Sequence, residues 1–238
     1  HYFRRARFYF FVMGMLAELE GKSWGIRKMG HCVYERLLRY AQGVFFLGEG
    51  EKDYAAHLFP STSKKFFVTP FPVDGAFWRP DSSAKCSYVL FIGNDLRRDY
   101  RLLLDIIRLM PEVSFKVITR NLHSQDVSRN AELIKGDWRQ EFLSDEDIRR
   151  YIQHSICVIL PLKDSFQPSG QSVAQQAMSC ARPVLISRTK GFWSPSFFEE
   201  GQIMFVDSSD SQSWMRRIRQ VLNDPDGADM IGKTARSL

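Results

Sequence analysis

Residues 161–187 read PLKDSFQPSGQSVAQQAMSCARPVLIS and contain the pattern that decides the fold. They follow an apolar run at 156–160 and end in a second apolar run at 184–186, and each run predicts a buried strand. Between the runs, a polar loop leads into a stretch with helical spacing that begins at Gln171. The order strand, loop, helix, strand is typical of a parallel sheet covered by helices.

The loop before this predicted helix has the composition of an anion-binding site. Gly170 allows a ligand to approach the backbone closely, and the hydroxyl groups of Ser169 and Ser172 can cap the helix. The first amides of a helix have no partner within it, so they and the helix dipole together stabilise a phosphate. Lys163 adds a positive charge. Many α/β proteins have such a loop without a ligand, so the neighbouring segments must decide between the two interpretations.

Residues 176–184, QAMSCARPV, resemble the nucleotide-sugar site of GT-B-fold glycosyltransferases, particularly the large retaining family 4, the group 1 transferases. In that family a strand ending in proline is followed by an acidic residue and a glycine-containing loop. A second acidic residue comes eight positions after the first, within Glu-Ala-Met-Ala-x-Gly-x-Pro-Val. Here Pro168 stands at the first acidic position, Gln176 at the second, and Ala181 at the usual glycine.

This resemblance implies a site for the diphosphate of a nucleotide sugar. The residues implied to hold it are Ser169, Gly170, Gln171 and Ser172, together with Lys163. The second acid of the family accepts hydrogen bonds from ribose hydroxyls, which the Gln176 carbonyl can also do. The first acid lies beside the transferred sugar, and Pro168 cannot replace it. The resemblance therefore implies donor binding more strongly than turnover, and it assigns no catalytic residue.

A second match lies at residues 70–80, PFPVDGAFWRP. It resembles the family's connection between domains, which has a proline or glycine, Val-Asp, and an aromatic residue two positions before a proline. The match predicts that residues 1–73 are a remnant of the N-terminal acceptor domain with its linker. Residues 74–238 would then be the C-terminal donor domain. An ordinary linker with two prolines also fits this composition.

The apolar run at 88–92 predicts the first strand of the donor domain, and residues 99–110 have amphipathic helical spacing. Family members place a glycine after this strand and a lysine or arginine before the helix, where it reaches the diphosphate. The resemblance assigns these positions to Gly93 and Arg98, with Arg97 as the alternative. A guanidinium group suits phosphate oxygens, although an arginine here could equally lie on the surface.

The family holds the nucleotide base after a later strand, in the region where Trp138 lies. The alternative for Trp138 is a half-buried side chain that covers the sheet edge. The first 42 residues have helix-like spacing, with a helix predicted from Tyr34 to Ala41. Ser144 and Asp147 resemble a capping box at the start of another helix.

The chain has 238 residues, a formal charge of +6 and a pI near 9.2, which favours anionic partners such as nucleotide phosphates, lipid-linked phosphates or an acidic membrane. No nucleic-acid recognition motif is present, so we expect no nucleic-acid partner. The four cysteines are far apart, and neither a CxxC pair nor a His/Cys cluster suggests a metal site. We therefore expect no metal ion and no cofactor, with the nucleotide sugar as substrate.

The longest apolar stretch, Phe8 to Ala17, is about half the length of a membrane-spanning helix. We expect a cytoplasmic protein. The arginine and aromatic residues at 4–11 could contact the inner face of a membrane, or could be core residues of a truncated domain.

These patterns predict a Rossmann-like, doubly wound parallel sheet, the GT-B C-terminal domain, with a partial N-terminal α/β segment. The resemblance implies a retaining transferase of polysaccharide biosynthesis. It would move a sugar from a UDP, GDP or similar donor to an unknown glycan or lipid-linked acceptor. The alternative is a non-catalytic module of the same fold that binds a nucleotide sugar or a partner, which the two missing acids favour.

Overall fold

The computed structural model describes residues 7–19, 22–69, 71–136, 143–192, 202–206 and 210–237. The chain forms two compact units. The first contains residues 1–71, 164–169 and 189–195, and the second contains residues 72–163, 170–188 and 196–238. Because two later segments cluster with the first unit, the simpler division at residues 73 and 74 stays a prediction.

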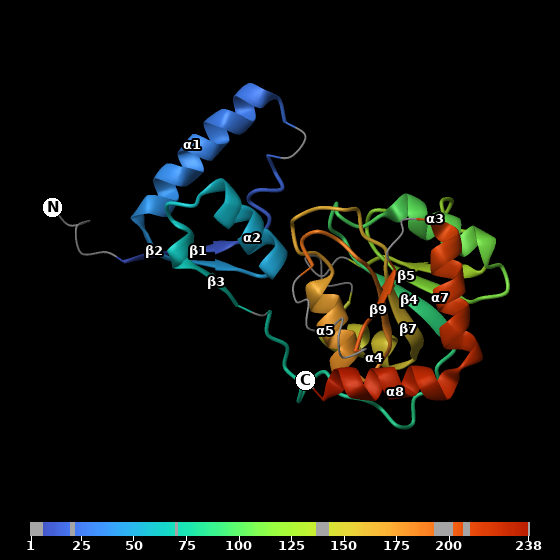
Figure 1. Cartoon of the computed structure of the whole chain (residues 1–238). Coiled ribbons are helices and arrows are strands. Elements are labelled where there is room, and N and C mark those ends of the chain that lie inside the picture. Colours follow the sequence, from blue (N-terminus) through green and yellow to red (C-terminus); the bar gives the residue numbers. More distant parts are fainter. Residues whose placement is uncertain are drawn as a thin grey trace. The chain divides into compact units, whose positions relative to one another are not determined.

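The first unit is built on three parallel strands in the order β1-β2-β3 (Figure 1). Its elements are β1 (Phe8–Val12), α1 (Trp24–Tyr40), β2 (Ala41–Phe46), α2 (Glu49–Leu58), the 3₁₀ helix η2 (Ser63–Lys65) and β3 (Phe66–Val68). The helical interpretation of the first residues was wrong at β1, because these aromatic side chains suit a strand that pairs with β2. Helix α1 also begins earlier than the predicted start at Tyr34.

One face of this small sheet is packed and the other carries aromatic rings. The packed core includes Val12, Leu16, Leu38, Val44, Phe46 and Phe59. On the other face the rings of Phe11 and Phe45 stack with centroids 5.2 Å apart, and Phe11 is 67% exposed. Helix α1 also exposes large apolar side chains, among them Trp24, Met29 and Tyr40. The first unit therefore presents an apolar surface next to the basic residues of α1.

A buried carboxyl group lies at the carboxyl end of this sheet. Glu51, in the first turn of α2, is fully buried, and its Oε1 accepts a hydrogen bond from the Gly14 backbone N–H at 3.0 Å. Burial raises the pKa of Glu51 to about 7, against the opposing effect of the Gly14 and Leu16 backbone N–H groups. Gly14 itself has a φ of 84°, which favours glycine.

The second unit is a six-stranded parallel sheet in the order β6-β5-β4-β7-β8-β9. Its strands are β4 (Tyr88–Ile92), β5 (Phe115–Ile118), β6 (Ala131–Ile134), β7 (Ser155–Leu160), β8 (Val184–Ser187) and β9 (Met204–Val206). Its helices are α3 (Tyr100–Leu109), α4 (Asp145–Gln153), α5 (Gln171–Ser179), α7 (Ser211–Asn223) and α8 (Pro225–Arg236). The predicted doubly wound parallel sheet is therefore confirmed.

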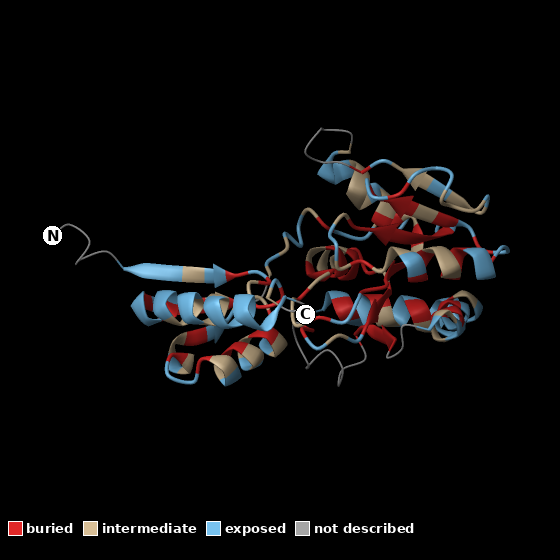
Figure 2. Ribbon diagram, turned by 90° about the horizontal axis from the view of Figure 1, so that it is seen from above, coloured by how far each residue is buried: buried red, intermediate tan, exposed pale blue. Residues whose placement is uncertain are grey.

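Helices cover both faces of this sheet, with α3 and α7 on one side and α4 and α5 on the other (Figure 1). The central strands are buried on both faces, as Figure 2 shows in red, which explains why β4 and β7 are continuous apolar runs. The predicted capping box of α4 is present, with Ser144 and Asp147 bonded reciprocally. Within the described residues, none of the helices combines the length and the apolar character that a membrane span requires.

The order of the strands reverses between β4 and β7. The chain passes from β4 outward to β5 and β6, then returns beside β4 to continue through β7, β8 and β9. In sheets of this type, ligands bind beyond the carboxyl ends of the strands at the point of reversal. The loops that follow β4 and β7 are therefore where a site is expected.

Candidate anion-binding site

The loop after β7 leads into helix α5 through Gly170. This residue is the N-cap of α5 and has a φ of 76°, which side chains rarely allow. The expectation that Ser169 or Ser172 caps the helix was wrong, because Gly170, which has no side chain, occupies the N-cap. The first-turn amides, which belong to Gln171, Ser172 and Val173, cannot find partners within α5. The helix therefore presents donors and its positive dipole end, as an anion site requires.

Arg98 lies beside Gly170. The arginine is only 3% exposed, and a Cβ placed on Gly170 would lie 3.1 Å from its Nη1 atom. A Cβ on Gly93 would collide with the same side chain from the β4 loop. Two glycines from the two loops at the reversal point thus leave the space that the arginine occupies. The sequence predicted these three residues as one site, and the structure brings them together.

Burial gives Arg98 an unusual electrostatic environment. Burial lowers the pKa of Arg98, whereas Asp95 and Tyr100 act in the opposite direction. The Asp95 carboxylate lies 3.3 Å from Nη1 and is itself 43% exposed. A buried cation of this kind is costly to desolvate, and a ligand phosphate would offset part of that cost. The environment of Arg98 therefore favours an anionic ligand.

The backbone around Arg98 is held against the β7 loop. Arg98 pairs with Leu162 in an isolated antiparallel bridge, and the Asp99 N–H donates to the Pro161 carbonyl at 2.9 Å. The Lys163 N–H donates to the Arg97 carbonyl at 2.8 Å. These bonds join the two loops directly across the point where the strand order reverses.

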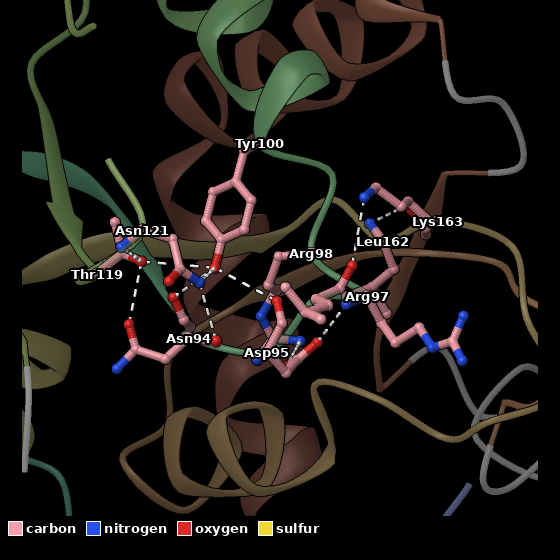
Figure 3. A network of polar contacts seen from close by, with 12 residues as sticks. Asn94, Asp95, Arg97, Arg98, Tyr100, Thr119, Asn121, Leu162 and Lys163 are labelled. Carbon is pink, nitrogen blue, oxygen red and sulfur yellow. Dashed lines mark hydrogen bonds and ion pairs between the residues drawn. The ribbon is translucent and has the colours of Figure 1, made fainter. Parts of the chain in front are cut away.

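Lys163 and Arg97, the other two candidate cations, lie on the outside of this junction. The Lys163 Nζ donates to the Leu96 carbonyl at 3.3 Å, and its side chain is exposed (Figure 3). Arg97 is half-buried, and its N–H donates to Asp95 Oδ1 at 2.9 Å. Of the two neighbouring arginines, Arg98 is the one between the glycines, so the geometry favours it over Arg97.

The other predicted site residues are Gln176, Ser169 and Trp138. Gln176 is half-buried on α5, in the second turn of the helix. Ser169 precedes Gly170 in the chain but clusters with the first unit, together with the buried Pro168. Trp138 lies outside the described residues. The roles of these residues stay predictions.

A polar network continues from this site along the carboxyl ends of β4, β5 and β6 (Figure 3). Asn94 Oδ1 accepts from the Arg120 N–H at 2.8 Å and from Thr119 Oγ1 at 3.1 Å. The Tyr100 hydroxyl donates to the Gly93 carbonyl at 3.0 Å and accepts from Asn121 Nδ2 at 2.8 Å. The sequence interpretation missed this network, although polar residues directly after two strands were its visible signal.

The described residues contain no group of three or more histidine, cysteine, aspartate or glutamate side chains placed to hold a metal ion. The positive groups found at the point where the strand order reverses are the Arg98 guanidinium and the amino end of α5. This arrangement can bind the oxygens of a phosphate or diphosphate.

A family comparison covers the α5 part of this site. Residues 139–238 match the family model described as glycosyl transferases group 1. The match covers less than half of the chain, so it shows which family this part of the chain is similar to. This family match confirms the resemblance seen in the sequence around Gly170 and Gln176. No curated protein matches the chain by sequence.

Solved glycosyltransferase structures share the fold of the whole chain. Anabaena Alr3699/HepE, solved in complex with UDP and glucose, aligns with a TM-score of 0.73 at 16% identity, over 98% of this chain and 66% of that one. TarM aligns with a TM-score of 0.72 at 16% identity, over 98% and 47%. WaaG, involved in lipopolysaccharide biosynthesis, aligns with a TM-score of 0.68 at 12% identity, over 96% and 69%. The chain thus spans about half to two thirds of the length of these proteins, and at such identity the likeness establishes the fold.

Proposed function

We propose that this chain supplies the donor site of a glycosyltransferase that moves a sugar from a nucleoside diphosphate sugar to an acceptor hydroxyl. The observation that carries the proposal is Arg98, buried between Gly93 and Gly170 at the amino end of α5. The family match at residues 139–238 supports it. HepE was solved with UDP and with UDP-glucose, which makes UDP the first nucleotide to test.

In the proposed reaction, the bond between the sugar's anomeric carbon and the diphosphate oxygen breaks. A bond forms from that carbon to the acceptor oxygen, the acceptor loses its hydroxyl proton, and the nucleoside diphosphate leaves. Negative charge therefore develops on the diphosphate, where Arg98 and the amides at 170–172 stabilise it. Lys163 adds positive charge at the rim. We assign no residue as the base, and we propose retention of configuration from the family resemblance alone.

The rest of the donor is assigned by resemblance. Gln176 would accept a hydrogen bond from the ribose, and the region of Trp138 would contact the base. We propose that no metal ion or other cofactor takes part, because Arg98 and the helix dipole already supply positive charge. The acceptor in this proposal is a glycan or a lipid-linked molecule.

We further propose a cytoplasmic location with peripheral contact to the inner membrane face. The exposed apolar side chains of α1 and its basic residues, Arg27, Lys28, Arg36 and Arg39, support this contact. Vesicles with and without anionic lipid would test it, because binding that depends on the anionic lipid is expected.

A non-catalytic module is the second candidate. Pro168, which takes the place of the first acid, is the observation that favours it. An assay of donor hydrolysis separates the two candidates, because a degenerate module binds the donor without releasing the sugar, whereas a transferase slowly hydrolyses it.

A thermal-unfolding panel with UDP, GDP, ADP and their sugar conjugates tests the donor site. A ligand at about a hundred times its dissociation constant adds roughly 2.7 kcal/mol of stability. Replacing Gly170 by valine should abolish this gain, because the side chain strains the φ of 76° and approaches the Arg98 Nη1. Gly75→Val is the matched control, since a Cβ there meets nothing within 4 Å.

The proposal predicts stabilisation of the wild type and of Gly75→Val by one nucleoside diphosphate, and none of Gly170→Val. Equal stabilisation of all three proteins would place the nucleotide elsewhere. No stabilisation of the wild type by any nucleotide would contradict the donor site itself.

A further inference from the structure

Arg98 depends on its surroundings for its position, because an arginine side chain has many rotamers and only some reach an anion. Its backbone is joined to the β7 loop at Leu162. The other side of the same loop begins at Gly93, which directly follows β4. Whatever holds the loop on the side of β5 and β6 therefore decides whether the guanidinium stays beside α5.

Asn94 forms several hydrogen bonds on that side, in addition to the bond from the Gly93 N–H to the Ile118 carbonyl. Its Oδ1 accepts from the Arg120 N–H at 2.8 Å, beyond the end of β5. Its Nδ2 donates to the Gly136 carbonyl at 2.6 Å, beyond the end of β6. Its own backbone carbonyl accepts from Asn121 Nδ2 at 2.9 Å. One side chain thus ties the ends of three adjacent strands together.

The Tyr100 hydroxyl strengthens the same network. It donates to the Gly93 carbonyl, and Asn121 donates to it in turn (Figure 3). The Gly93 carbonyl is thereby bonded to Tyr100, while the missing Cβ of Gly93 leaves the space that Arg98 occupies. Movement of the β4 loop would close that space or open it to water.

We propose that Asn94 is a positioning residue for the anion site: it locks the β4 loop to β5 and β6 and so fixes the Arg98 guanidinium at the amino end of α5. The proposal rests on the proposed donor function. An amide suits this task because it donates from one atom and accepts at another, whereas a carboxylate has no donor and a hydroxyl has only one polar atom. Asn94 acts through Arg98 and touches no ligand.

The chain offers a matched control in Asn130. This asparagine is also half-buried, and its Nδ2 donates to the backbone carbonyls of Ile107, Met110 and Val113, between 2.9 and 3.1 Å. It directly precedes β6, at the amino end of the same sheet. Asn130 therefore makes comparable bonds to the backbone but has no connection to Arg98.

The experiment compares Asn94→Leu and Asn130→Leu. Each replaces an uncharged side chain by another uncharged side chain of similar volume. Titration calorimetry measures binding of UDP, GDP, ADP and inorganic pyrophosphate, and urea unfolding measures stability. We expect both variants to lose stability and only Asn94→Leu to lose affinity, by about tenfold or more. Equal affinity of the two variants would overturn the proposal.

A double-mutant cycle with Arg98→Met separates positioning from a general loss of structure. In the Arg98→Met protein, Asn94→Leu should change ligand affinity no further, because no guanidinium is left to position. An additive loss would contradict the proposal. If Asn94→Leu does not fold, Tyr100→Phe takes its place, since it removes the hydroxyl with its bonds to Gly93 and Asn121 and should weaken binding about threefold. If the wild type binds none of the four probes, the proposed donor function fails as well. If the wild type binds and Asn94→Leu binds equally tightly, only the positioning role fails.

Discussion

The two ends of the six-stranded sheet use the same kinds of residue for different purposes. At the amino end, Asn130 bonds three backbone carbonyls where α3 finishes, and Lys116 lies near the rings of Tyr88 and Tyr151. At the carboxyl end, Asn94 bonds the segments that follow β5 and β6, and it lies in the same loop as Arg98. The first set of contacts stabilises neighbouring elements. The second set holds the loop that carries a buried cation, whose own desolvation is unfavourable.

This difference points to function at the carboxyl end. Packing alone does not require a guanidinium between two glycines, because replacing buried charged groups by well-packed apolar side chains is often neutral or stabilising. The small sheet of the first unit shows a related feature, since Glu51 is buried just beyond its carboxyl end. In both sheets, then, a buried ionisable group lies where the strands end.

The largest effect is expected from removing the buried charge. Arg98→Met should keep the free energy of unfolding or raise it, because an apolar side chain of similar length avoids the desolvation penalty. Its affinity for a nucleoside diphosphate should fall roughly a thousandfold, about 4 kcal/mol, since the ligand loses its buried partner. Urea unfolding and calorimetry on the same preparation measure both quantities. A large loss of stability with affinity unchanged would make Arg98 a purely structural residue.

Glu51 should make stability depend on pH. Its pKa is about 7 in the folded protein, against 4.5 for an ordinary glutamate, so the folded state binds the proton more tightly. Its contribution is fully present below pH 4.5 and is lost as the pH rises through 7. The loss amounts to about 3 kcal/mol at most, because each pKa unit corresponds to about 1.4 kcal/mol.

Glu51→Gln should remove this dependence while the amide oxygen still accepts from Gly14. The variant should therefore be more stable than the wild type at pH 8, and the gap should shrink toward pH 5. Urea midpoints across this range give the comparison, with the exposed Glu49→Gln as the control in the same helix. A gap that stays constant with pH would show that Glu51 is not the group that titrates.

The sheet could be predicted from the sequence because its central strands are buried on both faces. The apolar run predicted for β4 coincides with the observed strand, Tyr88–Ile92, and the capping box at Ser144 marks the start of α4. At β1 the same reasoning failed. That strand packs on only one side, and its row of aromatic residues fits a helix or a strand equally well.

The candidate site could be predicted only in part. Gly93, Arg98 and Gly170 each follow a strand, and the topology of a parallel sheet brings such residues together. The choice between Arg97 and Arg98 needs the loop conformation, because adjacent residues point in different directions. The position of Asn94 directly after a strand was a visible signal, but its partners could not be predicted, since they are backbone groups of Arg120 and Gly136, far away in the sequence.

The smallest effect is expected from a change at Lys116, at the amino end of the sheet. Replacing this residue tests whether a cavity that contains a cation is by itself evidence of a ligand site. A cavity of about 270 Å³ lies there, lined in part by Tyr88, Lys116 and Tyr151. Lys116 already has partners, with Nζ 2.8 Å from Glu132 and 4.9 Å from the Tyr88 ring centroid.

Because the ion pair is partly exposed, Lys116→Met should cost less than about 1 kcal/mol of stability. Nucleotide affinity should not change, because the cation lies at the other end of the sheet from Arg98. A tenfold loss of affinity in calorimetry would move the ligand to the amino end and undo the contrast between the two ends.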